Sequence, residues 1–343
     1  MVLIASSAAC SAPSTGRDAH AAPHTPTRTP TRRATPTASP ATRGTAALPA
    51  APGHKVGARP PQLTEAVVRW QLPSPVSRGV AMRYAGGALV AGGLGPGDRS
   101  TDDVLLVRPG QGQVTLAGHL AEPLHDAAGG LLAGRPTVVG GGAATELADV
   151  EQRGAGGAWR VVGRLPEARS DLSVVGAGDR LLVVGGYDGA ATPRAVLRTA
   201  HGSDFATVST LPSGVRYAGT ASTPRTAWIV GGERDGHELD EVLRLDLRSG
   251  SVRAVARLPR PLGHEAVAVV GGRLLVMGGR TTPDSVTDQM WWFDPRTRGW
   301  RRAGTLPYPV ADAPSVVTGH HVYLFGGETP DFTGRVTRVS WRR

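Results

Sequence analysis

One segment of 22 residues recurs six times in this chain, and each copy ends on a Gly-Gly pair. The copies align without a gap, and their pairs begin at positions 92, 140, 185, 231, 278 and 326. They start at Leu72, Leu120, Leu165, Leu211, Leu258 and Leu306, in steps of 45 to 48 residues. Such a period is typical of stacked or radial repeats, in which no unit buries its hydrophobic surface alone.

Each repeat unit contains the pattern of four short strands. Two apolar runs flank a turn rich in Gly, Pro or Arg, which predicts a hairpin. A third run follows the glycine pair after a loop of variable length, as in "DVLLV" and "QMWWFDP", and a fourth carries Trp159, Phe205 or Trp300 before the next unit. The 47 glycines and 28 prolines suit many tight turns. We therefore expect an all-β fold with four antiparallel strands per unit, labelled A to D.

The repeats resemble those of the Kelch family. The resemblance rests on the double glycine that ends strand B, on the aromatic residues Trp159 and Trp300, and on the segment "WWFDPRTRGW". It covers residues 64–343 and implies a six-bladed Kelch-type β-propeller. The sequence departs from the family pattern at Val114 and Val252, which replace the tryptophan, and at Ala121, which replaces a proline.

Closure of the ring follows from a count of strands. After the sixth glycine pair, "RVTRVSWRR" suffices for only one more strand. The missing strand D must come from "TEAVVRWQ", ahead of Leu72, so the N-terminal strand would close the last blade and leave no exposed seam. Positions eight to ten of each unit are mostly small, which places strand A at the crowded hub. The glycine pair would remove Cβ atoms where strand B turns beside its neighbour.

The formal net charge of +10 is concentrated at the N-terminus. Residues 1–63 carry seven basic side chains and one acidic one, whereas the other 280 residues carry 31 basic and 27 acidic ones. Phosphate binding requires a concentrated basic stripe, and the repeats show none. We expect no nucleic-acid partner.

The first ten residues, "MVLIASSAAC", resemble the end of a bacterial lipoprotein signal, which implies lipidation of Cys10. Ser7 departs from that pattern and no basic residue precedes the apolar run; a true start upstream of Met1 is one explanation. Alternatively, Cys10 is incidental in a disordered leader. Residues 11–63, rich in Pro, Thr and Ala, predict a disordered linker. We expect an extracytoplasmic protein, lipid-anchored or secreted, that touches a membrane only through that lipid.

Cofactor chemistry has little support in the sequence. Cys10 is the only cysteine, so no intrachain disulfide or cysteine zinc cluster can form. The Kelch resemblance includes copper radical oxidases of the galactose oxidase type, whose cofactor needs a cysteine-crosslinked tyrosine, and the propeller has no cysteine. His320 and His321 lie in a predicted surface turn without a third ligand. We expect no metal and no cofactor.

The D-to-A and B-to-C connections should share one face, and all the length variation falls in the B-to-C loops. Variable loops on a rigid scaffold are common binding sites. At the channel mouth on this face, positions six to eight bring together nine residues: Arg78, His125, Asp126, Asp171, Arg216, Tyr217, His264, Glu265 and Asp312. This site could hold a sugar acid or an acidic peptide loop. Alternatively, these are solvated loop charges and mutual ion pairs. Glu233 and Glu328, next to glycine pairs, lie on this face too, but the sequence indicates them less strongly as members of the binding site.

Two functions fit this site. The first is a non-catalytic, monomeric binding module for a protein or glycan. The second is a sugar-acid epimerase (mutarotase) resembling the Kelch-type sialic acid epimerases, with Arg216 on the substrate carboxylate and His264 or Glu265 transferring protons. Convergence of these side chains on one small pocket would favour the enzyme, and a broad rim would favour protein binding. We expect Arg216 and His264 to be exposed, so that their replacement by alanine changes stability little.

Overall fold

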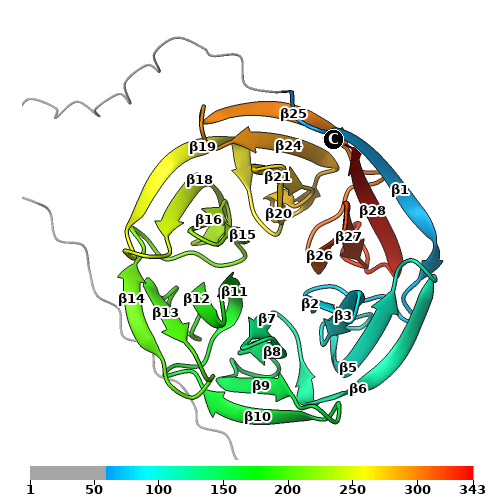
Figure 1. Cartoon of the computed structure of the whole chain (residues 1–343), viewed down its shortest axis with the longest axis vertical. Helices are drawn as coiled ribbons and strands as arrows, with labels where there is room; N and C mark the ends of the chain where they lie inside the picture. The colour runs from blue at the N-terminus through cyan, green and yellow to red at the C-terminus, as the bar shows by residue number, and fades with distance from the viewer. Residues whose placement is uncertain (1–58, 343) are drawn as a thin grey trace, which may run out of the picture. The chain divides into compact units, whose positions relative to one another are not determined.

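The computed structural model describes residues 59–342 and contains six blades around a central axis (Figure 1). Each blade is an antiparallel sheet of four main strands, and strand A is the innermost in every blade (Figure 1). Among the described residues there is no helix at all, and so none that could span a membrane. The predicted fold class, an all-β six-bladed propeller, is confirmed.

The strands follow one another in the order A to D within each blade. Blade 1 has β2 (Val80–Tyr84), β3 (Gly87–Ala91), β5 (Arg99–Arg108) and β6 (Gln113–Leu124). Blade 2 has β7 (Ala128–Leu132), β8 (Arg135–Val139), β9 (Asp149–Arg153) and β10 (Trp159–Arg164). Blade 3 has β11 (Ser170–Ala177), β12 (Arg180–Tyr187), β13 (Ala195–Thr199) and β14 (Ala206–Thr210). Blade 4 has β15 (Gly219–Thr223), β16 (Thr226–Val230), β18 (His237–Asp246) and β19 (Val252–Leu262). Blade 5 has β20 (Ala266–Val270), β21 (Arg273–Met277), β24 (Gln289–Asp294) and β25 (Gly299–Thr305). Blade 6 has β26 (Ser315–Thr318), β27 (His321–Phe325), β28 (Arg335–Arg342) and β1 (Gln62–Gln71).

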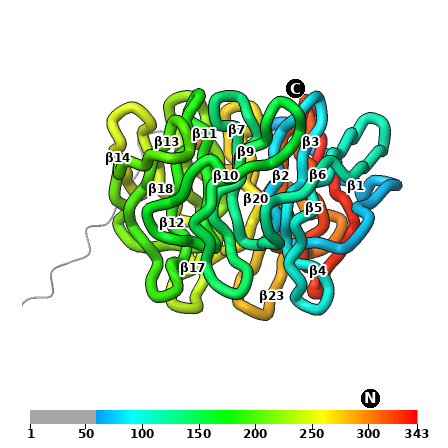
Figure 2. Tube along the Cα trace, turned by 90° about the horizontal axis from the view of Figure 1, so that it is seen from below, coloured from blue at the N-terminus to red at the C-terminus, as the bar shows by residue number. Residues whose placement is uncertain are grey.

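The connections divide the propeller into two faces. The D-to-A and B-to-C connections lie on one, the loop face, and the A-to-B and C-to-D turns lie on the other, the turn face. Four short additional strands lie in the B-to-C loops of the loop face: β4 (Leu94–Gly95), β17 (Glu233–Arg234), β22 (Arg280–Thr282) and β23 (Ser285–Val286). In Figure 2, β4, β17 and β23 mark the loop face at the lower end, and the C-terminus lies at the upper end. The prediction that these two kinds of loop share a face is confirmed.

Blade 6 is closed by the N-terminal strand, as the strand count predicted. Strand β1 pairs antiparallel with β28, from Gln62 opposite Arg342 to Gln71 opposite Arg335. The strand begins at Gln62, two residues before the predicted domain boundary at residue 64, so the end of the predicted linker 11–63 belongs to the sheet. The predicted leader, the lipidation site at Cys10 and most of that linker lie outside the described residues.

The hydrophobic core lies between the blades. One cluster joins Phe325 and Val336 of blade 6 to Val90 and Val107 of blade 1, so it bridges the seam where the chain closes on itself. Other clusters join further pairs of neighbouring blades in the same way. No single blade has a core of its own, which explains why the unit must be repeated.

The Gly-Gly pair is explained by the approach of the next blade. A Cβ on the first glycine of the sixth pair, Gly326, would lie 2.0 Å from the carbonyl oxygen of Val76, and this glycine has a φ of +63°. The N–H of the second glycine, Gly327, donates to that same carbonyl at 2.8 Å. The second glycine makes the equivalent bond to the next blade in all six units. The motif therefore joins blades, and only glycine fits at its first position.

Candidate functional site

The seventh residue of every repeat unit lies at the mouth of the channel on the loop face. These six residues are Arg78, Asp126, Asp171, Tyr217, His264 and Asp312, and we call them the mouth ring. Each N–H donates to the carbonyl oxygen of the preceding blade's counterpart, at 2.9 to 3.1 Å. The last bond crosses the seam, from Arg78 N–H to the Asp312 carbonyl at 2.9 Å. The six peptide groups thus form a closed ring of hydrogen bonds.

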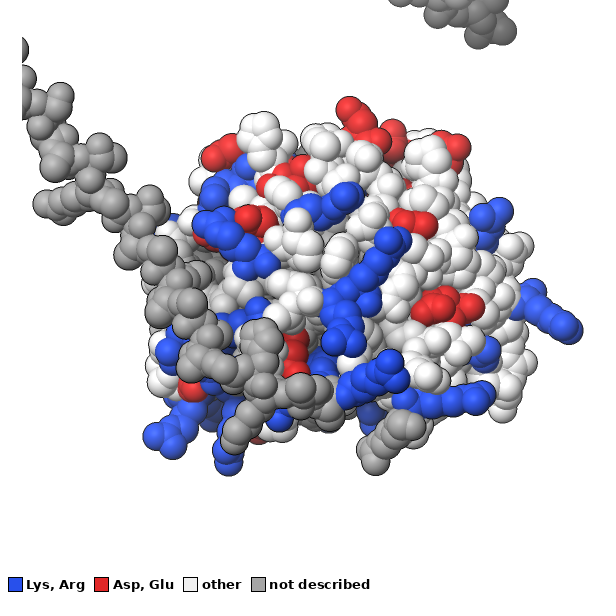
Figure 3. Space-filling model, turned by 90° about the horizontal axis from the view of Figure 1, so that it is seen from above, with Lys and Arg blue, Asp and Glu red and all other residues white. Residues whose placement is uncertain are grey.

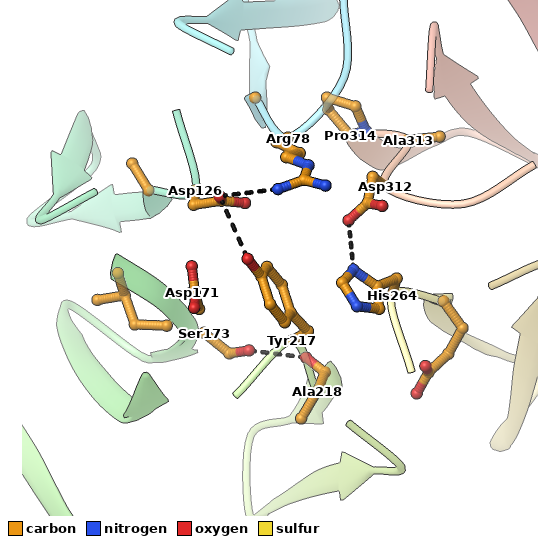
Figure 4. Close-up of a pocket in the computed structure, with 14 residues that line it drawn as sticks. Arg78, Asp126, Asp171, Ser173, Tyr217, Ala218, His264, Asp312, Ala313 and Pro314 are labelled. Carbon is orange, nitrogen blue, oxygen red and sulfur yellow. Dashed lines mark hydrogen bonds and ion pairs between the residues drawn. The ribbon is translucent and has the colours of Figure 1, made fainter. Parts of the chain in front are cut away.

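The backbone conformation of the mouth ring brings its side chains together. All six residues have positive φ angles, between 52° and 61°. This left-handed region is uncommon for residues other than glycine, and aspartate tolerates it better than most, which suits the three aspartates of the ring. The preceding residue pairs back to the end of the glycine motif, as Arg216 does with Glu233. Figure 4 shows the mouth-ring side chains of different blades pointing toward one another.

A pocket of about 150 Å³ lies at the mouth ring. Seven of the nine predicted site residues line it, namely the mouth ring and Glu265. The other two, His125 and Arg216, each precede a ring residue and contact the ring from behind. His125 Nε2 lies 3.7 Å from Asp126, and Arg216 donates to Asp171. The structure thus brings the nine predicted residues together at one end of the channel.

The charged side chains form one continuous series of ion pairs across all six blades, in which acidic and basic groups alternate. We call this series the ionic chain. In order, its members are Asp126, Arg78, Glu328, Arg280, Asp312, His264, Glu233, Arg216 and Asp171. Each member pairs with the next, and acidic and basic groups alternate throughout. Five carboxylates and four cations take part. His125 also contacts Asp126, at 3.7 Å, but burial and Arg78 lower the pKa of its imidazole, so this contact adds no positive charge at neutral pH and the charged groups begin and end on an aspartate.

The first half of the ionic chain is held by two arginines. Arg78 donates from Nε to Glu328 Oε1 at 2.9 Å and from Nη1 to Asp126 Oδ2 at 3.4 Å. Arg280 donates to the other oxygen of Glu328 and, through Nε, to Asp312 Oδ2 at 3.4 Å. Because each arginine already bridges two carboxylates, an acidic ligand would have to compete with these carboxylates for both guanidinium groups.

The second half is centred on His264. Its Nδ1 lies 2.7 Å from Asp312 Oδ1, and its Nε2 lies 3.6 Å from Glu233 Oε2. Arg216 donates from Nε to Glu233 at 3.1 Å and from Nη1 to Asp171 at 3.4 Å. The His264 side chain is only 5% exposed. The expectation that His264 is an exposed mouth residue is therefore wrong, because it lies in the middle of a buried ion network.

The alternative interpretation of these residues as loop charges is half right. Mutual ion pairs are present, as it stated. They are not solvated, because Asp126 and Asp171 are 8% and 7% exposed and the Asp312 side chain is 5% exposed. Tyr217 fills the centre, stacked on His264 with ring centroids 4.0 Å apart, and its hydroxyl donates to Asp126 at 3.4 Å.

The pKa shifts distinguish the middle of the ionic chain from its ends. Burial alone would lower the pKa of His264, but Asp312 and Glu233 raise it to about 9. The hydrogen bond from His264 outweighs burial and, with Arg216, lowers the pKa of Glu233 to about 2. At the ends, burial raises the pKa of Asp126 and of Asp171 more than their arginines lower it. The end carboxyls thus lack enough positive charge.

Glu265 stands apart from the ionic chain. It is 6% exposed, accepts a hydrogen bond from the Gly219 N–H at 3.2 Å, and has no hydrogen-bond partner for Oε2 among the described residues. Burial raises the pKa of its carboxyl to about 8. It occupies the eighth position of its unit, where other units have Gly79, Ala127 or Ala218, and so it forms part of the wall between blades 4 and 5.

Sequence reasoning missed one member of the site and gave two others little weight. Arg280 was not predicted, and Glu233 and Glu328 were given a weaker claim. All three directly follow a glycine pair. The signal was therefore present in the alignment, as a column of alternating charge beside the mouth ring.

One cluster away from the mouth has the composition of a cation site. Asp102, Asp103 and His119 lie on β5 and β6 of blade 1 with their ligand atoms within 4.8 Å of one another. His119 Nδ1 is 3.3 Å from Asp103 Oδ1, and all three side chains are at least 39% exposed. Since the histidine already pairs with both aspartates, these contacts are explained without an ion.

The fold and the site together define a six-bladed β-propeller whose channel is capped by a buried ionic network on the loop face. Comparisons with known proteins agree. Residues 261–307 match the family model for the Kelch motif. A solved structure, "Structure of YjhT", superimposes with a TM-score of 0.67 at 14% identity, over 80% of this chain and 99% of that chain. The described residues thus form a six-bladed β-propeller, as the repeats predicted, and one of its repeat units matches the Kelch motif.

Three curated proteins resemble parts of this chain, and the names of two of them contain the word Kelch. "Kelch repeat and BTB domain-containing protein 12" of Danio rerio is 29% identical over 119 residues, 31% of this chain. "Kelch-like protein 35" of Mus musculus is 27% identical over 173 residues, 49% of this chain. "Beta-scruin" of Limulus polyphemus is 22% identical over 236 residues, 64% of this chain. The matches span only 19% to 29% of those relatives' lengths.

Proposed function

We propose that this propeller is a non-catalytic protein-binding module that takes a basic side chain of its partner at the channel mouth. The observation that carries the proposal is the open end of the ionic chain. Asp126 and Asp171 are neighbours in the mouth ring, joined by the 2.9 Å bond from the Asp171 N–H to the Asp126 carbonyl. Both are acidic, and no described cation lies between them to continue the alternation.

A lysine ammonium or an arginine guanidinium would complete the alternating ring. The raised pKa values of both end carboxyls indicate that they need further positive charge to stay ionised. The pocket of about 150 Å³ is smaller than the roughly 300 to 1,000 Å³ of typical small-molecule sites, and so it suits one side chain of a larger partner. An acidic ligand, which the sequence suggested, would have to displace carboxylates from Arg78 and Arg216.

The rim of the loop face is also acidic, and so it too favours a basic partner. The B-to-C loop of each blade carries one acidic residue at or near its tip: Asp98, Glu146, Asp188, Asp235, Asp284 and Asp331. None of these six makes an ion pair with another described residue. A rim of unpaired carboxylates would steer a basic partner toward the mouth and raise its association rate.

The remaining parts of the proposal rest on sequence alone. We place the module outside the cytoplasm, with a lipid on Cys10 as its membrane anchor, because of the composition of residues 1–63. We also propose that the propeller is monomeric. A glycan ligand is the other form of the binding hypothesis, and it would have to bring a basic group such as an amino sugar.

A second candidate function is the sugar-acid epimerase. Convergence of the predicted side chains on one pocket is the observation that favours it. Of its assigned roles, those of Arg216 and His264 conflict with the local contacts, whereas Glu265 lines the pocket with one oxygen unpartnered among the described residues. Arg216 is held by Glu233 and Asp171, and His264, with a pKa raised to about 9, holds its proton at neutral pH and cannot serve as a base. Conversion of a sugar acid followed by NMR would revive this candidate.

The binding proposal is tested with an octalysine peptide. In isothermal titration, the Asp126→Asn, Asp171→Asn double variant should bind it about 10 to 100 times more weakly than wild type, because charge-assisted hydrogen bonds contribute about 1.5 to 3 kcal/mol. Asparagine keeps the left-handed backbone conformation, so the ring should remain intact. Asp179→Asn with Asp204→Asn, which removes two exposed charges from the turn face, is the matched control.

Three results would contradict the proposal. Equal weakening by the two double variants would mean that net charge alone controls binding. Absence of octalysine binding to wild type would remove the basic-ligand hypothesis. Tighter binding of an octaglutamate peptide than of octalysine would show that the site prefers an acidic ligand to a basic one.

A further inference from the structure

We propose that the turn face docks onto an anionic lipid surface, so that the loop face and its binding site point away from the membrane. This inference does not rest on the ligand of the channel mouth. It rests on the distribution of charge along the propeller axis, on unpaired arginines at one end, and on the place where the N-terminal segment joins the fold.

The two faces have opposite charge. The A-to-B and C-to-D turns, taken with the strand residue at each end, contain nine arginines and four aspartates, a net charge of +5. The B-to-C and D-to-A connections, counted in the same way, contain nine arginines and fourteen acidic residues, a net charge of −5. Figure 3 shows the propeller edge-on, with Asp and Glu gathered toward its upper edge, the loop face, and Lys and Arg reaching its lower part. A propeller that is nearly neutral as a whole is therefore polarised along its axis.

Several arginines of the turn face are free to contact an anionic surface. Arg135, Arg180 and Arg225 lie at the A-to-B turns of blades 2, 3 and 4, and Arg248 and Arg298 lie in the C-to-D turns of blades 4 and 5. All five are exposed, and none forms an ion pair with another described residue. The arginines of the channel mouth, in contrast, are all paired. All these turns lie at one end of the propeller (Figure 2), so a flat anionic surface at that end would be close to all five residues.

The N-terminal segment joins the fold on this same face. Strand β1 begins at Gln62, opposite Arg342 of β28, so its first residue lies at the end of blade 6 that belongs to the turn face. The sequence of residues 1–63 carries seven basic side chains and one acidic one. This basic part of the chain is therefore joined to the fold at the turn face.

The expected strength follows from the arginine count. Each arginine close to an anionic bilayer strengthens binding about fivefold, and the effect decays within about 10 Å at 0.1 M salt. Five arginines in one plane would give a strong attraction, whereas the five negative charges of the loop face would oppose the inverted orientation. The charge difference between the two faces thus promotes binding to the bilayer and also favours one orientation of the propeller on it.

The test uses the unlipidated full chain and sedimented vesicles that contain about 30% phosphatidylglycerol in phosphatidylcholine. Wild type should bind, and its binding should fall steeply between about 50 and 300 mM salt. The variant Arg135→Glu, Arg180→Glu, Arg225→Glu should bind more than about 100-fold more weakly, because it removes three attractive charges and adds three repulsive ones. The control Arg160→Glu, Arg260→Glu, Arg301→Glu makes the same change in net charge on exposed residues of the D strands, and it should lose about fivefold at most.

The possible outcomes separate the explanations. Equal losses in the two triple variants would show that net charge or the N-terminal segment controls binding, and would overturn the proposed face. Binding of wild type to pure phosphatidylcholine with equal affinity, or no vesicle binding at all, would overturn the lipid surface. Binding to soluble polyphosphate but not to vesicles would make the turn face a polymer site instead. If the glutamate variant does not fold, the same positions changed to glutamine should still lose about 100-fold relative to the matched glutamine control.

Discussion

At the scale of single residues, the mouth ring combines a structural and a chemical role. Its peptide groups tie six blades into a closed ring, and its side chains form or touch a buried ionic network. These roles are separable, because the hydrogen bonds use only backbone atoms. The residue type at the seventh position can therefore vary between Arg, Asp, Tyr and His without loss of the ring, provided that it tolerates a positive φ.

Glu265 should make the stability of the propeller fall as the pH rises. The folded protein holds the proton of Glu265 up to a pKa of about 8, whereas the unfolded chain releases it near 4.5. Stability from this group is complete below pH 4.5 and is lost between pH 4.5 and 8, by up to about 1.4 kcal/mol per pH unit. Glu265→Gln mimics the protonated form, so its unfolding free energy, measured in urea, should depend less on pH across this range.

The comparison of wild type with Glu265→Gln cancels the contribution of His264, since His264 titrates in both proteins. Its raised pKa makes stability fall between pH 6.5 and 9 in wild type and in the variant alike. The difference between the two proteins between pH 5 and 6.5 reports Glu265 alone. Identical slopes in that window would show that Glu265 is ionised inside the fold.

At the scale of structural elements, the glycine pair determines how one blade meets the next. Its first glycine approaches the neighbouring backbone too closely for any side chain, and its second donates to the same carbonyl. Within a blade, neighbouring strands are joined by regular antiparallel pairing, and strand B is buried along most of its length, as in β3 and β16. The joints between blades depend instead on this single motif and on the mouth ring.

Gly326→Ala should therefore be far more damaging than another glycine substitution with the same backbone strain. Gly319, in the turn of the same blade, has a φ of +58° and open space where an alanine methyl group would lie, whereas at Gly326 that methyl would lie 2.0 Å from the carbonyl oxygen of Val76. We expect Gly319→Ala to cost about 1 to 2 kcal/mol from strain alone, and Gly326→Ala several kcal/mol more. Thermal unfolding of both variants measures the difference, and similar melting temperatures would argue against the proposed joint.

At the scale of the whole molecule, closure through the N-terminal strand makes both ends of the folded chain necessary for one blade. Strand β28 lies between β27 and β1 in the sheet of blade 6. The core clusters on either side of this blade connect it to blades 5 and 1. Loss of one strand here should therefore open the ring at two interfaces.

Deletion of residues 336–343 tests this closure. The truncation removes β28, leaves β1 without a partner, and exposes apolar surface of blades 1 and 5, at roughly 25 cal/mol per Å². We expect a loss of several kcal/mol in unfolding free energy. Deletion of residues 342–343 alone, which removes one pair at the end of the ladder, should leave the melting temperature nearly unchanged. Equal stability of both truncated proteins would show that the ring does not depend on β28.

The fold could be predicted from the amino-acid sequence alone, because one structural unit is repeated along the chain. Six gap-free copies of one unit, each with a glycine pair, required a radial arrangement, and the strand left over at each end required closure by "TEAVVRWQ". The same alignment placed the mouth residues in one column and therefore on one rim. Positions in a repeat map onto equivalent places in space, so a column of the alignment is a ring in the structure.

Only the tertiary structure decided how those residues interact. Whether His264 is exposed, whether Arg216 is free to bind a carboxylate, and where the alternation of charge stops all depend on contacts between residues that are 17 to 251 positions apart in sequence. No local pattern encodes such contacts, because each side chain finds its partner only after six blades have closed into a ring. Burial then sets the pKa values and leaves Asp126 and Asp171 as the open ends, since the cost of burying a charge depends on the whole surrounding fold.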